Sequence, residues 1–348
     1  MDSVTQIALG GAVAYGVLGK QVGRKAIVWG AILGTLPDLD VLIPYGDPIA
    51  DFTYHRGFSH SLPMHMLASP VIAWLICAFH NRGKIGTESH YRSWVLAVFL
   101  CLSTHAILDS FTVYGTQLLW PFTEYPFALS NLFIIDPLVT IPLLVGCIVA
   151  LLPRINGHRS YCINTIGLIL CCGYITWSIG SKMYIDSKIE QALSANSILP
   201  SAYVSSPAPL NTLLWRAVAH KQNEYYEIYA SIFDDVSEVS INRYQSQPEL
   251  LIPIQSDWGV KRLQWFTKGL YAVSEDNNKI VITDLRMGVE CAYAFNFIVA
   301  EKTLAGTIRT DYEQLTLRPD LAELGDIFKR IWDPSISLAP KGKRLNDC

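Results

Sequence analysis

Charged residues are scarce in this chain. Only 16% of its 348 residues are Asp, Glu, Lys or Arg, 51% are hydrophobic, and the net charge is −3. This composition is unusual for a soluble globular protein, and so small a net charge gives no reason to expect a nucleic-acid partner. Between Leu132 and Ser181 only three residues are charged, whereas the thirty residues from Lys261 to Glu290 hold nine. We therefore expect a membrane-embedded N-terminal half and a water-soluble C-terminal half.

Two other common sequence signals are missing. No Cys-x-x-Cys spacing occurs, which excludes the usual cysteine zinc sites. The N-terminus lacks the basic stretch of a cleavable signal peptide, so we expect the first apolar segment to stay in the mature protein. Six of the eight cysteines lie in apolar segments as small hydrophobes. The other two, Cys291 and Cys348, could pair if the C-terminal half lies in an oxidising compartment.

Apolar stretches predict a membrane helical bundle of about six segments within residues 1–183. A helix that spans the hydrocarbon core needs about 20 mainly apolar residues. The predicted segments are Val4–Leu18, Ala26–Leu36, Leu62–Phe79, Trp94–Leu108, Leu132–Leu152 and Tyr161–Gly180. The first two are short and rich in glycine, so they are either tilted spans or helices packed inside the bundle.

Basic residues in the connecting loops predict the orientation of the bundle. The loops after the first, third and fifth segments hold eight basic residues, which are Lys20, Arg24, Lys25, Arg82, Lys84, Arg92, Arg154 and Arg159. The loops on the opposite side hold only one basic residue, Arg56. Because basic loops stay in the cytoplasm, we expect a multi-pass protein of a bacterial inner membrane with its C-terminal half extracytoplasmic.

From residue 184 onward the pattern changes to short β-type runs. Strands are predicted at Tyr225–Ile232, Gly269–Ser274, Lys279–Leu285 and Ala292–Val299, with a short helix at Asp257–Thr267. The segment Pro200–Leu210 is predicted to be an irregular linker. The fold class is therefore a membrane α-helical bundle followed by a soluble α+β domain over residues 184–348.

Six ionisable residues are expected at one membrane face. They are Asp38, Asp40, His55, His60, His105 and Asp109, and each lies at or beyond the outer end of a predicted segment. Ionisable groups at membrane depth usually pair, bind an ion or mark a pathway. His105 and Asp109 stand four residues apart on a predicted helix and therefore share one face. A shared metal site explains this set better than independent structural roles do.

The chemistry of these side chains predicts their roles. Mixed His and Asp ligands suit Zn²⁺, with Mn²⁺ or Fe²⁺ as alternatives, and such a cation activates water near neutral pH. The predicted metal ligands are Asp38, His55, His60, His105 and Asp109. Asp40 or Asp109 is the expected general base, and Arg56 the expected cation for developing charge. Arg56 has an alternative role as an ion-pair partner of Asp38, Asp40 or Asp51. His65 is expected to be a hydrogen-bonded interior residue, and a helix cap explains Asp136 as well as a site role does.

Four motifs resemble the YdjM-like family of membrane-bound, metal-dependent hydrolases. They are the opening Met1–Thr5, Gly34–Asp40, His55–Ser61 and Thr104–Asp109, and Thr283–Gly288 is similar to an Asp-x-Arg-x-Gly segment in longer members of the family. The resemblance implies a hydrolase and places the family's metal-site candidates on the five ligands named above, with Asp40 nearby. The family usually has a histidine where this chain has Gln6, and an amide binds zinc poorly.

Three functions fit these patterns. The favoured one is an integral membrane, metal-dependent hydrolase with its active site at the outer membrane face, acting on a lipid or lipid-linked phosphoester. The second is a metal-ion or proton transporter, although transporter sites usually lie near the bilayer midplane. The third is a non-enzymatic membrane anchor for the soluble domain. The expected partners are the lipid bilayer and a lipid-like substrate, and the sequence does not identify a protein partner.

Overall fold

A computed structural model describes residues 1–80, 88–155, 157–304, 306–315 and 324–340. The chain forms two compact units. The helical unit contains residues 1–43 and 56–178, and the C-terminal unit contains residues 44–55 and the chain from Ile179 onward. The sequence places the change between the two parts at 183/184, and it places residues 44–55 with the bundle.

Helices occupy all six positions where the sequence predicts membrane segments. These helices are α1 (Ser3–Val22), α2 (Lys25–Thr35), α4 (Leu62–His80), α5 (Glu88–Ser110), α6 (Pro137–Leu151) and α7 (Gly157–Ala195). In the described part of the chain, α4, α5 and α7 are long and apolar enough to cross a membrane. Helices α2 and α6 are apolar but shorter. The count of six spans stays a prediction, and Arg82 and Lys84, used for the orientation, lie outside the described residues.

Glycines let α1 and α2 pack with their backbones in contact. A Cβ atom added to Gly10 would lie 2.1 Å from the carbonyl oxygen of Gly30, and one added to Gly34 would lie 2.4 Å from that of Gln6. Only residues without a side chain allow this approach. The contact places Gln6 of α1 against the end of α2, directly before the short 3₁₀ helix η1 (Pro37–Leu42).

The connection between α5 and α6 contains no helix and holds the motif His55–Ser61 in place. A bridge between Thr116 and Phe127 stabilises its hairpin-like turn. The amide of Gln117 donates to the carbonyl of Arg56 at 3.0 Å, and the amide of Leu62 donates to that of Leu118 at 2.9 Å. These bonds flank the 3₁₀ helix η2 (Phe58–His60) and fix its backbone.

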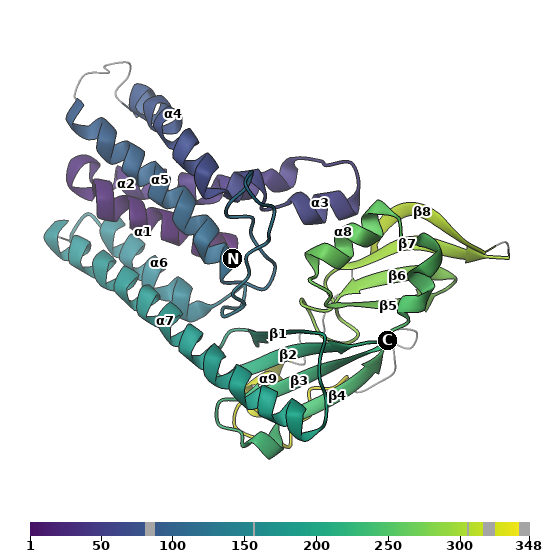
Figure 1. The fold of residues 1–348 in the computed structure, drawn as a ribbon. Helices are drawn as coiled ribbons and strands as arrows, with labels where there is room; N and C mark the ends of the chain where they lie inside the picture. Colours follow the sequence, from purple (N-terminus) through teal and green to yellow (C-terminus); the bar gives the residue numbers. More distant parts are fainter. Residues whose placement is uncertain (81–87, 156, 305, 316–323, 341–348) are drawn as a thin grey trace. The chain divides into compact units, whose positions relative to one another are not determined.

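The C-terminal unit contains two four-stranded antiparallel sheets (Figure 1). The first is formed by β1 (Ala202–Pro207), β2 (Leu214–Lys221), β3 (Glu224–Ser231) and β4 (Ser240–Gln245), in that order. The second is formed by β5 (Tyr271–Asp276), β6 (Lys279–Asp284), β7 (Asn296–Thr303) and β8 (Gly306–Leu315). The helices of this unit include α8 (Trp258–Phe266) and α9 (Leu324–Arg330). The four predicted strands and the predicted helix are confirmed with shifted ends.

One prediction for this unit is wrong. Strand β1 lies inside the segment Pro200–Leu210, which the sequence predicts to be an irregular linker. Its backbone pairs with β2 in the register Ala202↔His220. A prediction from local pattern misses this strand because pairing with a distant segment, rather than local propensity, stabilises it.

The end of α7 builds the core of the first sheet. Ile185, Ile189 and Leu193 repeat every four residues along the helix and pack with Trp215 and Ile228. This spacing puts the three side chains on one helix face. The helix therefore continues well past the last predicted membrane segment, because burial against the sheet stabilises its final turns.

Residues 44–55 form a short excursion that belongs to the C-terminal unit. Their helix α3 (Pro48–Tyr54) starts at Asp47, whose carboxylate accepts from the amides of Ile49 and Ala50. Helix α3 contacts α8 and β8 (Figure 1). The sequence did not predict a helix here, since seven residues are too few to show a periodic pattern.

The cysteines follow the sequence expectation where the structure describes them. Cys77, Cys101, Cys147, Cys162, Cys171 and Cys172 are free thiols. Cys291 is disulfide-bonded. A pairing with Cys348, which the sequence allows if this half lies in an oxidising compartment, involves a residue outside the described part of the chain.

Candidate metal centre

Four of the predicted ligands come together in the helical unit. Asp38, His60, His105 and Asp109 each offer one ligand atom, and these atoms all lie within 4.8 Å of one another. Asp38 is on η1, His60 ends η2, and the other two lie on the last turns of α5. Three of the side chains are buried, and that of Asp38 is 25% exposed. Of the four side chains, only that of Asp38 is therefore in contact with solvent.

The distances between the ligand atoms fit one cation. The Nε2 atoms of His60 and His105 lie 3.2 Å apart. Asp38 Oδ1 lies 3.5 and 3.3 Å from these two nitrogens, and Asp109 Oδ2 lies 3.3 and 3.6 Å from them. A tetrahedral site with bonds of about 2.0–2.1 Å has ligand atoms roughly 3.3 Å apart. Five of the six separations among these atoms thus fit a tetrahedral site, and the two carboxylates lie within 4.8 Å of each other.

Hydrogen bonds behind the two imidazole rings orient them toward the centre. Nδ1 of His105 donates to the carbonyl of Gly34 at 2.7 Å. Ser59 Oγ donates to Asp40 Oδ2 at 2.6 Å and lies 2.9 Å from Nδ1 of His60, so it can accept the proton of that nitrogen. With both Nδ1 atoms protonated, both Nε2 lone pairs face each other. Two lone pairs this close repel unless a cation or a proton lies between them.

Asp38 carries its charge at the open side of the group. Burial raises the pKa of its carboxyl, but the contacts with the imidazoles of His105 and His60 outweigh burial and hold the pKa well below its usual range. An ionised carboxylate beside two imidazole nitrogens is a suitable cation ligand.

Asp109 is held by partners on its other side. Gln6 Nε2 donates to Asp109 Oδ1 at 2.9 Å, and the amino group of Met1 contacts the same oxygen. Gln6, which stands where the family has a histidine, therefore orients a ligand and is not one of the four. Sequence reasoning missed this role because the partner of an amide cannot be read from its position alone.

Arg56 is buried next to the group. Its Nε lies 3.2 Å from Asp109 Oδ2, and its guanidinium lies 4.9 Å from the ring centre of Tyr114. Nη1 donates to Thr112 Oγ1 at 3.3 Å. The main-chain amide of Arg56 donates to Asp40 Oδ2 at 3.0 Å. The side chain thus pairs with Asp109, which the sequence did not name among its partners.

Besides Arg56, two predicted site residues lie outside the group of four. Asp40 lies behind His60, with its Oδ2 atom 3.6 Å from His60 Nδ1, where it accepts from Ser59 and from the Arg56 amide. His55 directly follows α3 and belongs to the C-terminal unit. The predicted roles of both as base or ligand stay predictions.

The expected structural roles of two other residues agree with the structure. Nε2 of His65 lies 2.8 Å from the carbonyl of Ser59, so this histidine is a hydrogen-bonded interior residue, as predicted. Asp136 caps α6 by accepting from the amide of Leu138 at 3.0 Å, and it also accepts from Tyr174 Oη.

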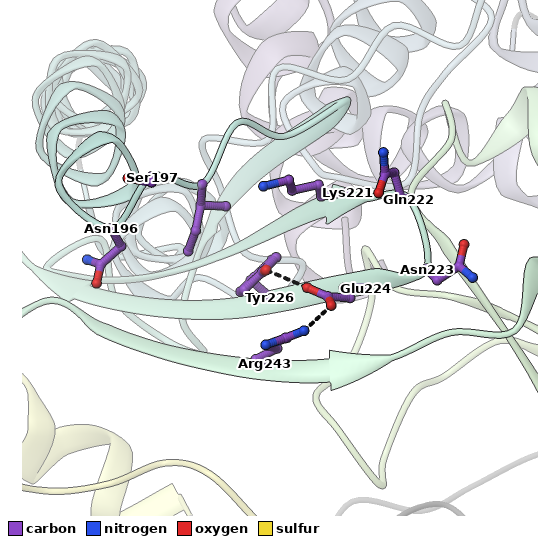
Figure 2. A pocket seen from close by; sticks show the side chains of 9 residues that line it. Asn196, Ser197, Lys221, Gln222, Asn223, Glu224, Tyr226 and Arg243 are labelled. Atoms are coloured by element: carbon purple, nitrogen blue, oxygen red, sulfur yellow. Dashed lines mark hydrogen bonds and ion pairs between the residues drawn. The ribbon is translucent and has the colours of Figure 1, made fainter.

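A separate cavity of about 670 Å³ lies in the C-terminal unit beside the turn between β2 and β3 (Figure 2). Its lining is mainly polar, and Glu224 pairs there with Arg243 and accepts from Tyr226. None of the predicted site residues lines this cavity. Its acid and its arginine neutralise each other.

The apolar helices and the His/Asp group define a membrane protein with a candidate metal centre, extended by a sheet-rich C-terminal unit. The model of the YdjM inner membrane protein family matches residues 1–185. The chain belongs to this family. It is also 28% identical, over 148 residues, to the uncharacterized protein YfhP of Bacillus subtilis (strain 168). That match covers 40% of this chain and 43% of YfhP, so the chain aligns with less than half of this relative. No solved structure matches the chain significantly.

Proposed function

We propose that this protein is a membrane-bound, metal-dependent hydrolase with one divalent cation, Zn²⁺ in the first place, held by Asp38, His60, His105 and Asp109. The close approach of these four ligand atoms, all within 4.8 Å of one another, carries the proposal. Two imidazoles and two carboxylates form a ligand set that suits zinc, and manganese or iron are the alternatives. Such a cation would supply Lewis acidity and lower the pKa of a bound water.

The residues around the group have roles that follow from their positions. Asp40 and Ser59 hold the ring of His60, and the Gly34 carbonyl holds that of His105. Arg56 keeps a positive charge beside Asp109. A buried positive charge such as that of Arg56 favours a substrate group that gains negative charge during the reaction. This supports an ester or phosphoester as the substrate.

The expected location of the group supports a lipid substrate. The basic loops favour an orientation in which Asp38 faces the outer side of the membrane. A site at that level meets lipid head groups and lipid-linked intermediates. We therefore propose a lipid or lipid-linked phosphoester as the substrate and the outer membrane face as the place of reaction.

The proposal is tested by metal content and hydrolysis on the full chain in detergent. The wild type should contain about one equivalent of zinc and hydrolyse a member of a lipid phosphoester panel. His60→Ala and Asp109→Ala should lose the zinc and the hydrolysis. His65→Ala is the matched control, because this histidine is also buried but bonds to a backbone carbonyl.

Three results would contradict the proposal. A wild-type protein that contains no transition metal would show that these residues do not form a metal centre. Equal zinc content in the His60→Ala and wild-type proteins would place the metal elsewhere. Zinc without hydrolysis, together with metal flux in proteoliposomes, would favour the transporter.

A further inference from the structure

The segment between the two halves of the site motif is anchored in the C-terminal unit. The chain leaves the helical unit at Ile43, shortly after Asp38 and Asp40, and returns to it at Arg56. Everything between these points, including α3, belongs to the C-terminal unit. The first carboxylates of the site and its first histidine are thus joined by a segment that another unit holds.

An aromatic socket holds α3 within that unit. Phe52 is buried, and its ring centre lies 4.9 Å from that of Phe266, 4.4 Å from that of Phe295 and 5.2 Å from that of Phe297. Rings at these separations pack favourably beyond the gain from burial alone. The three partner rings come from α8, β7 and the residue before β7, so the socket exists only when this unit is folded.

Contacts on either side of Phe52 fix α3 in one position. Ile49 is fully buried, and a Cβ atom on Gly259 of α8 would lie 2.8 Å from its Cδ1 atom. Arg262 Nε donates to Thr53 Oγ1 at 3.0 Å. The guanidinium of Arg262 also lies 4.5 Å from the ring centre of Tyr54. Each residue from Phe52 to Tyr54 is therefore in contact with the C-terminal unit.

The Asp-x-Arg-x-Gly segment supports the socket. Arg286 and Asp284 form a buried ion pair, with 2.6 Å between Nη2 and Oδ2 and 2.9 Å between Nε and Oδ1. The Arg286 guanidinium lies 5.1 Å from the ring centre of Phe266, which is one wall of the socket. The segment that the sequence singled out thus stabilises the ring against which Phe52 packs.

The chain is also constrained where it returns to the helical unit. Arg56 has a φ of 61°, a left-handed conformation that is unfavourable for a residue with a side chain. The bond from its amide to Asp40 holds it there. Strained conformations of this kind persist where the surrounding structure fixes them. A shift of α3 would therefore displace Asp40 and Arg56, because the chain connects them directly to this helix.

We propose that the C-terminal unit is a positioning domain for the metal centre and that Phe52 is its positioning residue. By holding α3, the unit fixes the chain on both sides of it, and with it Asp40, Arg56 and the orientation of His60. This inference rests on the proposed metal centre.

The test compares zinc affinities of the full chain in detergent. Phe52→Ala should weaken zinc binding about tenfold, as changes behind metal ligands do. Phe52→Leu keeps most of the buried volume and should restore most of the affinity. Ile228→Ala is the matched control, since Ile228 is fully buried in the first sheet of the same unit and is not part of the socket. Its zinc affinity should equal that of the wild type.

A second variant covers the case in which Phe52→Ala does not fold. Arg262→Gln removes the bond to Thr53 and leaves the aromatic socket intact, and it should weaken zinc binding in the same direction by a smaller factor. The positioning role would be overturned if Phe52→Ala bound zinc as tightly as the wild type while His60→Ala bound none. That result would still support the metal centre. Equal weakening in Ile228→Ala would overturn the particular role of Phe52. A wild type that binds no zinc would overturn both.

Discussion

At the scale of single residues, the C-terminal unit buries two carboxyls around one arginine. Arg216 pairs with Glu227, which also accepts from Tyr293 Oη at 2.6 Å. Glu290 accepts from Tyr225 Oη at 2.6 Å. Burial, together with the nearby charge of Glu227, raises the pKa of Glu290 to about 7, although the bond from Tyr225 opposes this shift. The carboxyl of Glu290 is therefore protonated in the folded state at mildly acidic pH.

This protonation predicts a pH dependence of stability. The pKa of Glu290 rises on folding from 4.5 to about 7, so its contribution to stability is complete below about pH 4.5 and is lost as the pH rises through 7. The loss amounts to at most about 3 kcal/mol. Thermal unfolding of the full chain at pH 5.5 and 8 should show it, and Glu290→Gln should show a smaller difference. Glu313→Gln, at an exposed position, is the control and should keep the pH dependence of the wild type; a Glu290→Gln protein with the same pH dependence as the wild type would contradict the prediction.

The sequence predicted five candidate ligands, of which four come together, but it did not predict their surroundings. His105 and Asp109 could be found because residues four apart on a helix share a face. The Gly34 carbonyl behind His105 could not, since any residue provides a backbone carbonyl. The role of Gln6 was equally hidden, because it depends on the packing of α1 against α5.

At the scale of elements, the contact between α1 and α2 depends on the absence of side chains. A Cβ atom on Gly30 would lie 2.1 Å from the carbonyl oxygen of Gly10 and 2.5 Å from Cβ of Ala14. Backbone atoms cannot move aside as a flexible side chain does. The two helices must therefore separate if this position gains a side chain.

Gly30→Ala should consequently destabilise the helical unit by about 1–3 kcal/mol. Because α2 leads into Asp38, the zinc content should fall as well. The thermal unfolding midpoint and the metal content of purified protein measure the two effects. Gly173→Ala in α7 is the control, since an added Cβ there meets nothing within 4 Å. A Gly30→Ala protein as stable as this control would show that the helices do not need the close contact.

The predicted elements differ in how far they could be read from the sequence. Strands such as β6 and β7 were found because their apolar residues are continuous. Strand β4 has no fully buried residue and so shows no apolar signal. Helix α3 was missed for another reason, since its burial depends on aromatic residues more than two hundred positions further along the chain.

At the scale of the whole molecule, the orientation in the membrane is the main open prediction. The basic loops predict that the C-terminal unit lies outside the cytoplasm. The disulfide at Cys291 agrees with this, because disulfides persist in oxidising compartments.

Cysteine labelling in intact cells tests the orientation. A membrane-impermeant maleimide should label Ser237→Cys, at an exposed position of the C-terminal unit, before cell lysis. Gln21→Cys, at the exposed end of α1, should be labelled only after lysis. The parent chain reports the reaction of the native thiols. The reverse pattern would place the C-terminal unit in the cytoplasm and the metal centre at the inner face.

The sequence by itself determined the division into an apolar helical part and a sheet-rich part, together with the four candidate ligands. Charge scarcity, helical spacing and the His/Asp motifs are local properties, so they can be read directly from the chain. Only the tertiary structure decided that Gln6, Ser59 and the Gly34 carbonyl support those ligands, and that α3 belongs to the C-terminal unit. These facts depend on packing and hydrogen bonds between residues far apart in the sequence, which no local pattern records.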